Sequence, residues 1–147
     1  MLRKTLPLAA FALISIAGAT PAFAGECPAA NMAPNALAER ITEPKGVTDT
    51  VIGAVDLGKE IGVAGRQLRT RRLVVQPGGV VPFHSHGDRP ALIYTVSGQI
   101  TEYRSSCTAP IVHKAGDIAR EADGISHYWV NHGKVPAVLL SSDVFHG

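Results

Sequence analysis

The sequence lacks most of the short motifs that would assign a reaction directly. It has no Gly-x-Ser-x-Gly elbow, no phosphate-binding glycine loop and no Cys-x-x-Cys pair. Its acidic residues are scattered in predicted turns, which argues against a hydrolase that works with paired carboxylates. Serine-hydrolase, nucleotide-phosphate and dithiol chemistries therefore have no support in the sequence.

Long hydrophobic runs are also missing. The apolar stretch 6–16 is too short for a helix that spans a membrane comfortably. The basic Arg3 and Lys4 precede it, and the small-x-small triplet 22–24 follows it. This order is typical of a secretory signal peptide. We predict that residues 1–24 are removed, that the mature chain starts at Gly25, and that the protein is periplasmic or secreted. An uncleaved membrane anchor is the alternative, and Glu26 directly before Cys27 argues against lipidation.

Neither sign of charge dominates the predicted mature chain. The full sequence has 14 Lys and Arg against 12 Asp and Glu, and two of the basic residues belong to the predicted signal peptide. The balance therefore gives no argument for nucleic acid, or for a membrane after cleavage, as a partner. Residues 25–147 have the size of one ordinary domain, and a small molecule is the expected partner.

Cysteine is scarce, with only Cys27 and Cys107 in the chain. In an oxidising compartment the default expectation is that the two form a disulfide. It would tie the N-terminal segment to a distant point of the chain. Two free thiols, or one cysteine acting as a metal ligand, are the alternatives.

The pattern of turn residues predicts an all-β domain. Residues 25–46 read as a tail in which Asn35 caps a short helix over 36–41 and Pro44 ends it. From there to the end, residues 47–147, short strand-like runs alternate with turn sequences, which favours a sandwich or barrel. The predicted strands are 48–57, 67–75, 80–84, 91–96, 100–105, 111–113, 118–121, 126–130 and 137–145, with turns at 77–79, 87–88, 97–98, 115–117 and 123–124.

Three histidines are candidate metal ligands. His84 and His86 are two residues apart, so a strand would place both on one face. His127 lies in a later strand-like run, 126–130. Neutral imidazoles bind divalent transition metals well, and a three-histidine site leaves a position open for water, dioxygen or substrate.

Glycine and histidine spacing also links these residues to a known family. One set runs Gly78, five residues, His84, one residue, His86, and later Gly98; the other runs Gly116, five residues, Ala122-Asp123-Gly124, two residues, His127, three residues, Asn131. The two sets resemble the paired motifs of the cupin superfamily over residues 67–145. The resemblance implies a jelly-roll barrel, a double-stranded β-helix, with a short helical or extended N-terminal tail. It also implies a site for one divalent transition metal (Zn, Mn, Cu, Fe or Ni) on His84, His86 and His127.

Position 91 departs from the family pattern. The family carries a glutamate ligand there, whereas this chain has Ala91. We therefore predict a sphere of three histidines with space beside it, in which the substitution Ala91→Glu tightens metal binding. Asp88 could supply a replacement oxygen, although a turn role or an ion pair with Arg89 is the plainer interpretation. The alternative to metal binding is a degenerate member of the family that binds a small molecule without metal or is purely structural.

Strand alternation predicts which side chains line a pocket beside the histidines. If position 91 faces inward, Ile93 and Thr95 do too and Tyr94 faces outward; Trp129 and Asn131 would share the face of His127. In the cluster Arg69, Arg71 and Arg72, at least one arginine faces each side of its strand. An inward one would bind a carboxylate or phosphate, whereas outward ones are simply solvated. The pocket candidates are Ala91, Ile93, Thr95, Trp129, Asn131 and Arg71, while His113, His132 and His146 are expected on the surface and Asp117 in a turn.

Three functions fit these observations. The first is an exported mononuclear metalloenzyme that acts on a small molecule at the three-histidine site. The second is a non-catalytic module that captures a small molecule or a metal, which the lack of an obvious acid or base beside the histidines favours. The third is a dimerisation domain, because the resemblance implies that two copies pair through their sheets as a homodimer.

Overall fold

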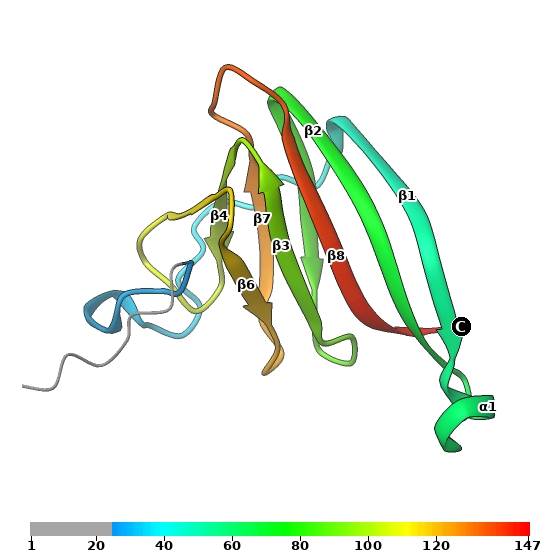
Figure 1. The fold of residues 1–147 in the computed structure, drawn as a ribbon. Coiled ribbons are helices and arrows are strands. Elements are labelled where there is room, and N and C mark those ends of the chain that lie inside the picture. The colour runs from blue at the N-terminus through cyan, green and yellow to red at the C-terminus, as the bar shows by residue number, and fades with distance from the viewer. Residues whose placement is uncertain (1–24) are drawn as a thin grey trace, which may run out of the picture.

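The computed structural model describes residues 25–147, so the predicted signal peptide, residues 1–24, lies outside the described part of the chain. The described residues form eight strands, and the expectation of an all-β barrel is confirmed (Figure 1). The strands are β1 (Lys45–Asp56), β2 (Arg66–Ser85), β3 (Ala91–Ser97), β4 (Gln99–Arg104), β5 (Ile111–Lys114), β6 (Ile118–Glu121), β7 (Ser126–Val130) and β8 (Ala137–His146).

The long strand β2 organises the barrel because it belongs to both of its walls. Its first half pairs with β1 and with β8, from Arg66↔His146 to Val75↔Ala137, and its second half pairs with β7. The hydrogen-bonded order is β5-β4-β7-β2-β8-β3-β6, with β1 added beside β2. In Figure 1, β1, β2 and β8 run side by side and extend past the shorter strands toward helix α1 (Leu57–Ile61). One wall is therefore longer than the other.

The predicted turn at 77–79 is a bend inside β2. Residues 76–79 stay extended enough to continue the strand, and Gly78 has φ of 71°. The side chain of Asn131 donates a hydrogen bond to the carbonyl of Val75 over 2.8 Å, and its backbone N–H donates to Gly79. These bonds hold the strand where it passes from one wall to the other. The other predicted strands agree with the observed ones to within three residues at each end.

Alternation along the strands places the apolar side chains between the two walls. The largest buried cluster draws on β2, β3, β4, β6, β7 and β8. Tyr94 lies on the outer face of β3, as expected, with 42% of its surface exposed. The cluster consists of Leu73, Val75, Ala91, Ile93, Ile100, Ala119, Trp129, Ala137 and Leu139.

The predicted helix at 36–41 is wrong. Residues 36–41 are irregular, and Asn35 has φ of 53° rather than a helix-capping conformation. The backbone of this segment bonds to the barrel, with Ala36 N–H donating to Ser105 and Phe83 N–H donating to Ile41. Leu37 packs on the outer face of the β2, β4 and β7 wall. Tertiary hydrogen bonds thus outweigh the local helix propensity of the tail. The short 3-10 helix of the tail lies earlier, at Ala29–Asn31.

The one α-helix of the described chain, α1, begins at Leu57, the last residue of the strand predicted over 48–57, and continues over residues for which no element was predicted. Asp56 accepts hydrogen bonds from the N–H groups of Gly58 and Lys59, and Gly62 ends the helix with φ of 74°. This is the ordinary chemistry of a helix N-cap and a left-handed C-cap. Nowhere in residues 25–147 is there a helix long and apolar enough to cross a membrane.

Cys27 and Cys107 form a disulfide in the structure. An ion pair between Glu26 and Arg104 (3.4 Å) lies next to it, and an isolated bridge joins Met32 to Cys107. The N-terminal segment is therefore held against the barrel by a covalent bond, a charge pair and backbone pairing at neighbouring positions.

Removing the disulfide is expected to destabilise the domain. The bond closes a loop with a sequence separation of 80 residues, and the chain-entropy model assigns such a loop roughly 4 kcal/mol. We expect the double variant Cys27→Ser, Cys107→Ser to lose about 2–4 kcal/mol of unfolding free energy in urea denaturation. Wild-type protein titrated under denaturing conditions should show no free thiol, and two reactive thiols would contradict the pairing.

Candidate metal centre

The three histidines predicted as ligands converge inside the barrel. His84 lies near the end of β2 and pairs directly across the sheet with His127 of β7, while His86 follows just after β2. The centroids of the three rings are 4.6–5.0 Å apart. His86 and His127 are fully buried, whereas His84 is half-buried. Strand alternation predicts that His84 and His86 share a face. The pairing of β2 with β7 adds His127 to them.

A fourth side chain, Glu121 of β6, joins the cluster, so the candidate ligand set contains a carboxylate in addition to the three histidines that were predicted. Strand β6 pairs with β3 so that Glu121 lies directly opposite Ala91. Residues that face each other across a strand pair point to the same side of the sheet, and the small side chain of Ala91 leaves room there. The carboxylate missing at position 91 is therefore supplied by the neighbouring strand. For the same reason, Ala91→Glu should crowd the site rather than tighten it.

The four side chains present ligand atoms to one another at short range. Glu121 Oε2 lies 2.9 Å from His86 Nε2, and Glu121 Oε1 lies 3.3 Å from His127 Nε2. His127 Nε2 is 3.2 Å from His84 Nε2. One ligand atom from each of the four side chains lies within 4.8 Å of the others. Three nitrogens and a carboxylate oxygen in this spacing could hold one metal ion.

Hydrogen bonds on the other side of each ring fix the tautomers. Nδ1 of His84 lies 2.8 Å from the carbonyl of Pro82, and Nδ1 of His86 lies 2.7 Å from the carbonyl of Arg89. Because a carbonyl oxygen only accepts, both Nδ1 atoms must carry the proton. The Nε2 lone pairs of His84 and His86 then point into the cluster, as a metal site requires.

The tautomer of His127 is set by Glu102, a carboxylate in β4 with no exposed surface. Glu102 Oε1 lies 2.6 Å from His127 Nδ1. The indole nitrogen of Trp129 is 3.1 Å from the same Nδ1, but the shorter contact to a carboxylate decides where the imidazole proton lies. His127 and Glu102 thus form the carboxylate–histidine pair that orients metal ligands in proteins.

Glu102 is kept ionised by its partners. Burial acts to raise its pKa, but hydrogen bonds from His113, His127 and Arg104 outweigh burial and hold the pKa well below the usual range. Arg104 donates twice, from Nε over 2.8 Å and from Nη2 over 2.9 Å. A permanent negative charge therefore faces the back of His127.

His113 was predicted on the surface, and that prediction was wrong. Its side chain is fully buried, donates from Nε2 to Glu102 over 3.0 Å, and stacks on Trp129 with centroids 4.6 Å apart. Strand β5 pairs with β4, which carries His113 inward beside Glu102. His132 and His146 are exposed as predicted, and Asp117 accepts a hydrogen bond from the backbone of Lys114 in its turn.

The buried cluster fits a cation. In the neutral form of the rings, with each Nδ1 proton on its acceptor outside the cluster, three Nε2 lone pairs and the carboxylate of Glu121 face one another, and His86 Nε2 is buried without a hydrogen-bond partner. Burial, followed by the neighbouring His127, lowers the pKa of His84 to about 3, so this imidazole is neutral at neutral pH. Among residues 25–147, no arginine or lysine forms an ion pair with Glu121. A divalent ion would neutralise Glu121 and satisfy the three lone pairs.

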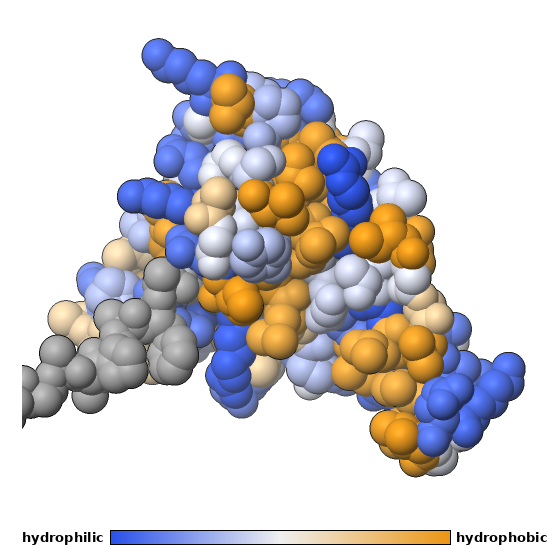
Figure 2. Space-filling view, viewed as in Figure 1, coloured by the Kyte–Doolittle hydropathy of each residue, from blue (hydrophilic) through white to orange (hydrophobic). Residues whose placement is uncertain are grey.

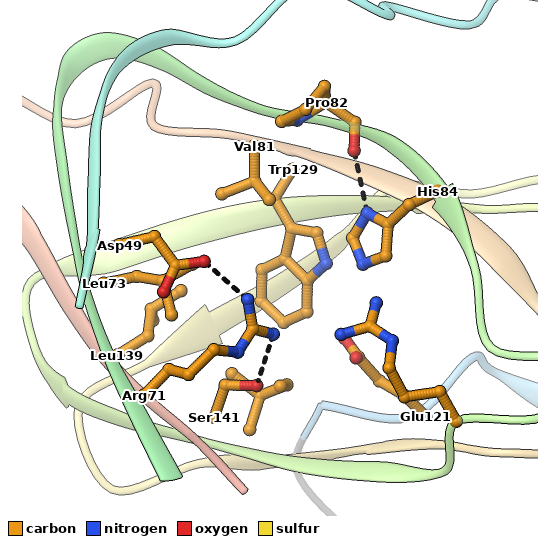
Figure 3. Close-up of a pocket in the computed structure, with 12 residues that line it drawn as sticks. Asp49, Arg71, Leu73, Val81, Pro82, His84, Glu121, Trp129, Leu139 and Ser141 are labelled. Carbon is orange, nitrogen blue, oxygen red and sulfur yellow. Dashed lines mark hydrogen bonds and ion pairs between the residues drawn. The ribbon is translucent and has the colours of Figure 1, made fainter. Parts of the chain in front are cut away.

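A cavity of about 210 Å³ opens beside this cluster (Figure 3). His84 and Glu121 form one side of it, and Arg71 of β2 reaches into it from the opposite side. Three of the six pocket candidates, Arg71, Ile93 and Trp129, line it. The remaining lining is supplied by Asp49, Leu73, Val81, Pro82, Arg89, Leu139 and Ser141.

The other pocket candidates lie elsewhere. Ala91 and Thr95 are buried in the barrel, away from the cavity wall. Asn131 is fully buried and uses its side chain on Val75, Val135 and Gly133. Its place in the second motif therefore has a structural reason, since it holds the bend of β2.

A second buried carboxylate, Asp143 of β8, lies beside the cavity. Arg69 donates to both of its oxygens, over 3.0 and 2.8 Å, and Arg89 donates over 2.8 Å. Asp88 lies exposed in the bend after β2, which agrees with the predicted turn role, but its ion pair is with Arg66 and not with Arg89. Burial acts to raise the pKa of Asp143, but the bonds from Arg69 and Arg89 outweigh it and hold that pKa below its ordinary value.

Glu121 carried no sequence signal that could have identified it. The predicted strand 118–121 was correct in extent, but nothing in four residues specifies which strand it pairs with. In the family motif the glutamate lies at a fixed distance along the chain from His86, whereas metal coordination depends on distance in space. Only the β3–β6 register reveals that position 121 replaces position 91.

The antiparallel barrel and its inward-facing cluster of histidines and a carboxylate place this chain among small β-barrel proteins with a candidate metal site inside the barrel. The Cupin domain family model matches residues 71–143, and the chain belongs to the cupin superfamily. The matched range includes all four candidate metal ligands, as well as Arg71 of the cavity.

Relatives and solved structures agree with this assignment. Auxin-binding protein ABP19b of Prunus persica is 37% identical over 84 residues, which are 55% of this chain and 40% of the relative. Germin-like protein 1 of Brassica napus is 30% identical over 103 residues, 66% of this chain and 50% of the relative. The chain thus spans about half the length, or less, of these relatives. A predicted oxalate decarboxylase from Thermotoga maritima shares the fold with a TM-score of 0.57 at 22% identity, covering 82% of this chain and 98% of that one.

The lowered pKa of Asp143 makes stability depend on acid pH. Because its folded pKa lies below the unfolded value of about 3.9, its contribution is complete above about pH 4 and is lost as pH falls below that through the folded pKa. We expect Asp143→Asn to lose about 3 kcal/mol of unfolding free energy at pH 7, since three arginines lose their partner. Urea denaturation at pH 7 and pH 3 should show a smaller pH effect in the variant than in wild type. An unchanged pH effect would contradict this role.

Proposed function

We propose that this protein is an exported metal-binding cupin that holds one divalent transition metal on His84, His86, His127 and Glu121. The observation that carries the proposal is the convergence of three imidazole nitrogens and one carboxylate oxygen, with every Nδ1 hydrogen-bonded to an acceptor outside the cluster. A three-histidine, one-carboxylate sphere suits Zn, Mn, Cu, Fe or Ni, and the element is identified by measurement.

The ligand of this site is a small molecule that enters the cavity of about 210 Å³ beside His84 and Glu121. A metal there would act as a Lewis acid and offer an open position to water or substrate. Residues of the chain would orient the metal ligands. Glu102 orients His127, and the backbone carbonyls of Pro82 and Arg89 orient His84 and His86, respectively. The apolar side chains of the cavity would exclude water from the body of the bound molecule.

Binding without turnover is the second candidate function. Among the residues that line the cavity, His84 and Glu121 belong to the ligand set, and Asp49 is paired with Arg71. This leaves the cavity without a separate general acid or base. The relatives include proteins named for auxin binding, and their names support capture of a small molecule as a function of this barrel type. Substrate-dependent turnover by the metal-loaded protein would decide for the enzyme.

Export and self-association complete the proposal. The signal-like residues 1–24 and the disulfide between Cys27 and Cys107 support a periplasmic or secreted protein. Leu92, Tyr94 and Ile118 are exposed on the outer face of β3 and β6, and Figure 2 shows hydrophobic residues on the face that carries β3 and β8. These residues support pairing of two copies through this face. Intact mass and light scattering of the exported protein test the two statements.

The position of the carboxylate can be tested by moving it back. We expect wild-type protein purified without chelator to hold about one metal ion per chain, and His127→Ala to hold none. Glu121→Ala should weaken metal binding by at least about tenfold. The double variant Ala91→Glu, Glu121→Ala should recover part of that loss, because the two positions face each other across β3 and β6.

Elemental analysis and competition with a metal-sensitive dye give the stoichiometry and affinity of each variant. Ala91→Glu alone is the matched control, because it adds a carboxylate without removing Glu121 and should not tighten binding. Substoichiometric metal in wild type after reconstitution would overturn the proposal. Unchanged affinity in Glu121→Ala would remove that residue from the ligand set.

Glu102 is expected to act on the metal through His127. Glu102→Gln keeps the size of the side chain but replaces the ionised acceptor that fixes the His127 tautomer. Changes to such partners typically cost 10–100-fold in metal affinity, and we expect about that loss. Circular dichroism should show an unchanged fold. If metal affinity is unchanged in a folded Glu102→Gln, the orienting role is contradicted.

A further inference from the structure

The buried ring of His113 has one nitrogen that is left without a partner. Its Nε2 lies 3.0 Å from Glu102 Oε2, and that nitrogen carries a proton because an ionised carboxylate only accepts. In the neutral form of the ring, Nδ1 is therefore an acceptor. Among residues 25–147, no group donates to this Nδ1, although the His113 side chain has no exposed surface. A buried acceptor of this kind calls for a donor.

Gly25 is the residue whose backbone lies against this nitrogen. A Cβ atom at position 25 would be 2.6 Å from His113 Nδ1 and 3.4 Å from the carbonyl oxygen of Ile118. The first distance is too short for a carbon atom, and the φ of Gly25 is 91°, so a residue with a side chain would be strained here. The close approach needs glycine, and it brings the backbone next to two acceptor atoms.

The next two residues of the chain hold Gly25 in this place. Cys27 is bonded to Cys107, and Glu26 pairs with Arg104 over 3.4 Å. A covalent bond and an ion pair therefore fix the first described residue of the chain against the back of the barrel interior.

The charges around this contact can accept a further cation. Arg104 donates to Glu102 from Nε and Nη2 and also reaches Glu26, so one guanidinium serves two carboxylates. Lys114 follows His113 in the chain, but its side chain is exposed and forms an ion pair with neither of these carboxylates. A positive charge placed against His113 would therefore lie near carboxylates that share a single arginine.

Gly25 is also the predicted first residue of the mature chain. Hydrolysis of the bond between Ala24 and Gly25 by a signal peptidase gives the hydroxyl of water to the Ala24 carbonyl carbon and its hydrogen to the Gly25 nitrogen, which takes up a further proton from solvent. The product is an α-ammonium group with three donor hydrogens, charged at neutral pH because an α-amine has an ordinary pKa of about 7.7–8.0. The amide nitrogen of the precursor has one hydrogen and no charge.

We propose that the α-ammonium of Gly25, created by signal-peptide removal, donates to His113 Nδ1 and completes the hydrogen-bond chain that runs through Glu102 to His127. This inference rests on the proposed function for export and for the metal, whereas the contact between Gly25 and His113 forms without metal. The α-ammonium is a positioning group, because it holds His113, which holds Glu102, which orients a metal ligand. The unprocessed precursor lacks this donor and binds metal less tightly than the mature chain.

The pKa of the α-amine tests the contact directly. A chain that begins at Gly25 and a chain that keeps Ala24 are released from an N-terminal fusion, with the disulfide formed and metal removed by chelator. The rate of acetylation of the α-amine is measured against pH by mass spectrometry of the N-terminal peptide. Shielding lowers this rate at every pH, whereas a hydrogen-bond acceptor moves the midpoint. We expect the midpoint of the Gly25 chain to lie about half a pH unit or more above that of the chain that keeps Ala24.

Three variants of the Gly25 chain separate the contribution of His113 from other causes. His113→Phe keeps a ring that can stack on Trp129 but removes the acceptor, and Gly25→Ala pushes the backbone away from Nδ1, so both should lose the upward shift. Glu26→Gln is the matched control, because it removes the nearest carboxylate in the chain and should keep the difference between the two chain starts. If His113→Phe does not fold, as judged by circular dichroism, Gly25→Ala still tests the contact.

The effect on the metal site is measured by competition for zinc with a metal-sensitive dye on the same samples. Changes to the direct partner of a metal ligand typically cost 10–100-fold in affinity, and for a group one partner further away we expect the chain that keeps Ala24 to bind zinc about three- to tenfold more weakly. In His113→Phe, keeping Ala24 should cause no further loss, because both changes remove the same contact.

Equal midpoints for the two chain starts would overturn the inference, as would a shift that persists in folded His113→Phe and disappears in Glu26→Gln, or a shift without any change in zinc affinity. Exported protein whose intact mass shows a first residue other than Gly25 would also overturn it and would leave zinc binding at the proposed site intact. A raised midpoint that depends on His113, in protein that takes up no zinc, would support the contact while the metal proposal fails.

Discussion

The barrel depends on how it neutralises three buried carboxylates, Glu102, Glu121 and Asp143, each at most 1% exposed. A buried carboxylate without a cation is expensive, so each needs a partner. Glu102 has Arg104 and two histidines, and Asp143 has Arg69, Arg71 and Arg89. Glu121 alone has no arginine or lysine partner among residues 25–147, and its contacts are the imidazoles of His86 and His127. The demand for a cation is therefore concentrated at the point where the three histidines meet.

The permanent ion pairs and the candidate metal site divide the interior between them. Glu102 and its partners lie behind His127, on the side toward β4 and β5, where Arg104 also reaches Glu26 beside the disulfide. Asp143 and its arginines lie on the side toward β8, next to the cavity. The first group fixes the orientation of His127, and the second holds the side chains of Arg71 and Arg89 at the cavity wall. Both roles follow from carboxylates that stay ionised because their partners outweigh the cost of burial.

The sequence predicted those features that depend on neighbours along the chain. Alternation located nearly every strand, the spacing of glycines and histidines identified the cupin resemblance, and the pair His84 and His86 was assigned to one face. Local sequence signals predicted the structure of the N-terminal tail incorrectly. The helix expected at 36–41 follows from local propensity, but its backbone groups find partners on Ser105 and Phe83 instead. Local signals are weak wherever a segment has no periodic pattern to bury.

By itself, then, the sequence determined the all-β class, the strand positions and three of the four side chains of the candidate metal site, because each is encoded by strand alternation or by the spacing within one short motif. Tertiary structure decided the rest. The pairing of β3 with β6 placed Glu121 opposite Ala91, the pairing of β4 with β5 buried His113 against Glu102, and the register of β2 turned Arg71 toward the cavity. The physical reason is that a strand's alternation fixes which residues share a face, whereas its partner and register are fixed only when the whole barrel closes.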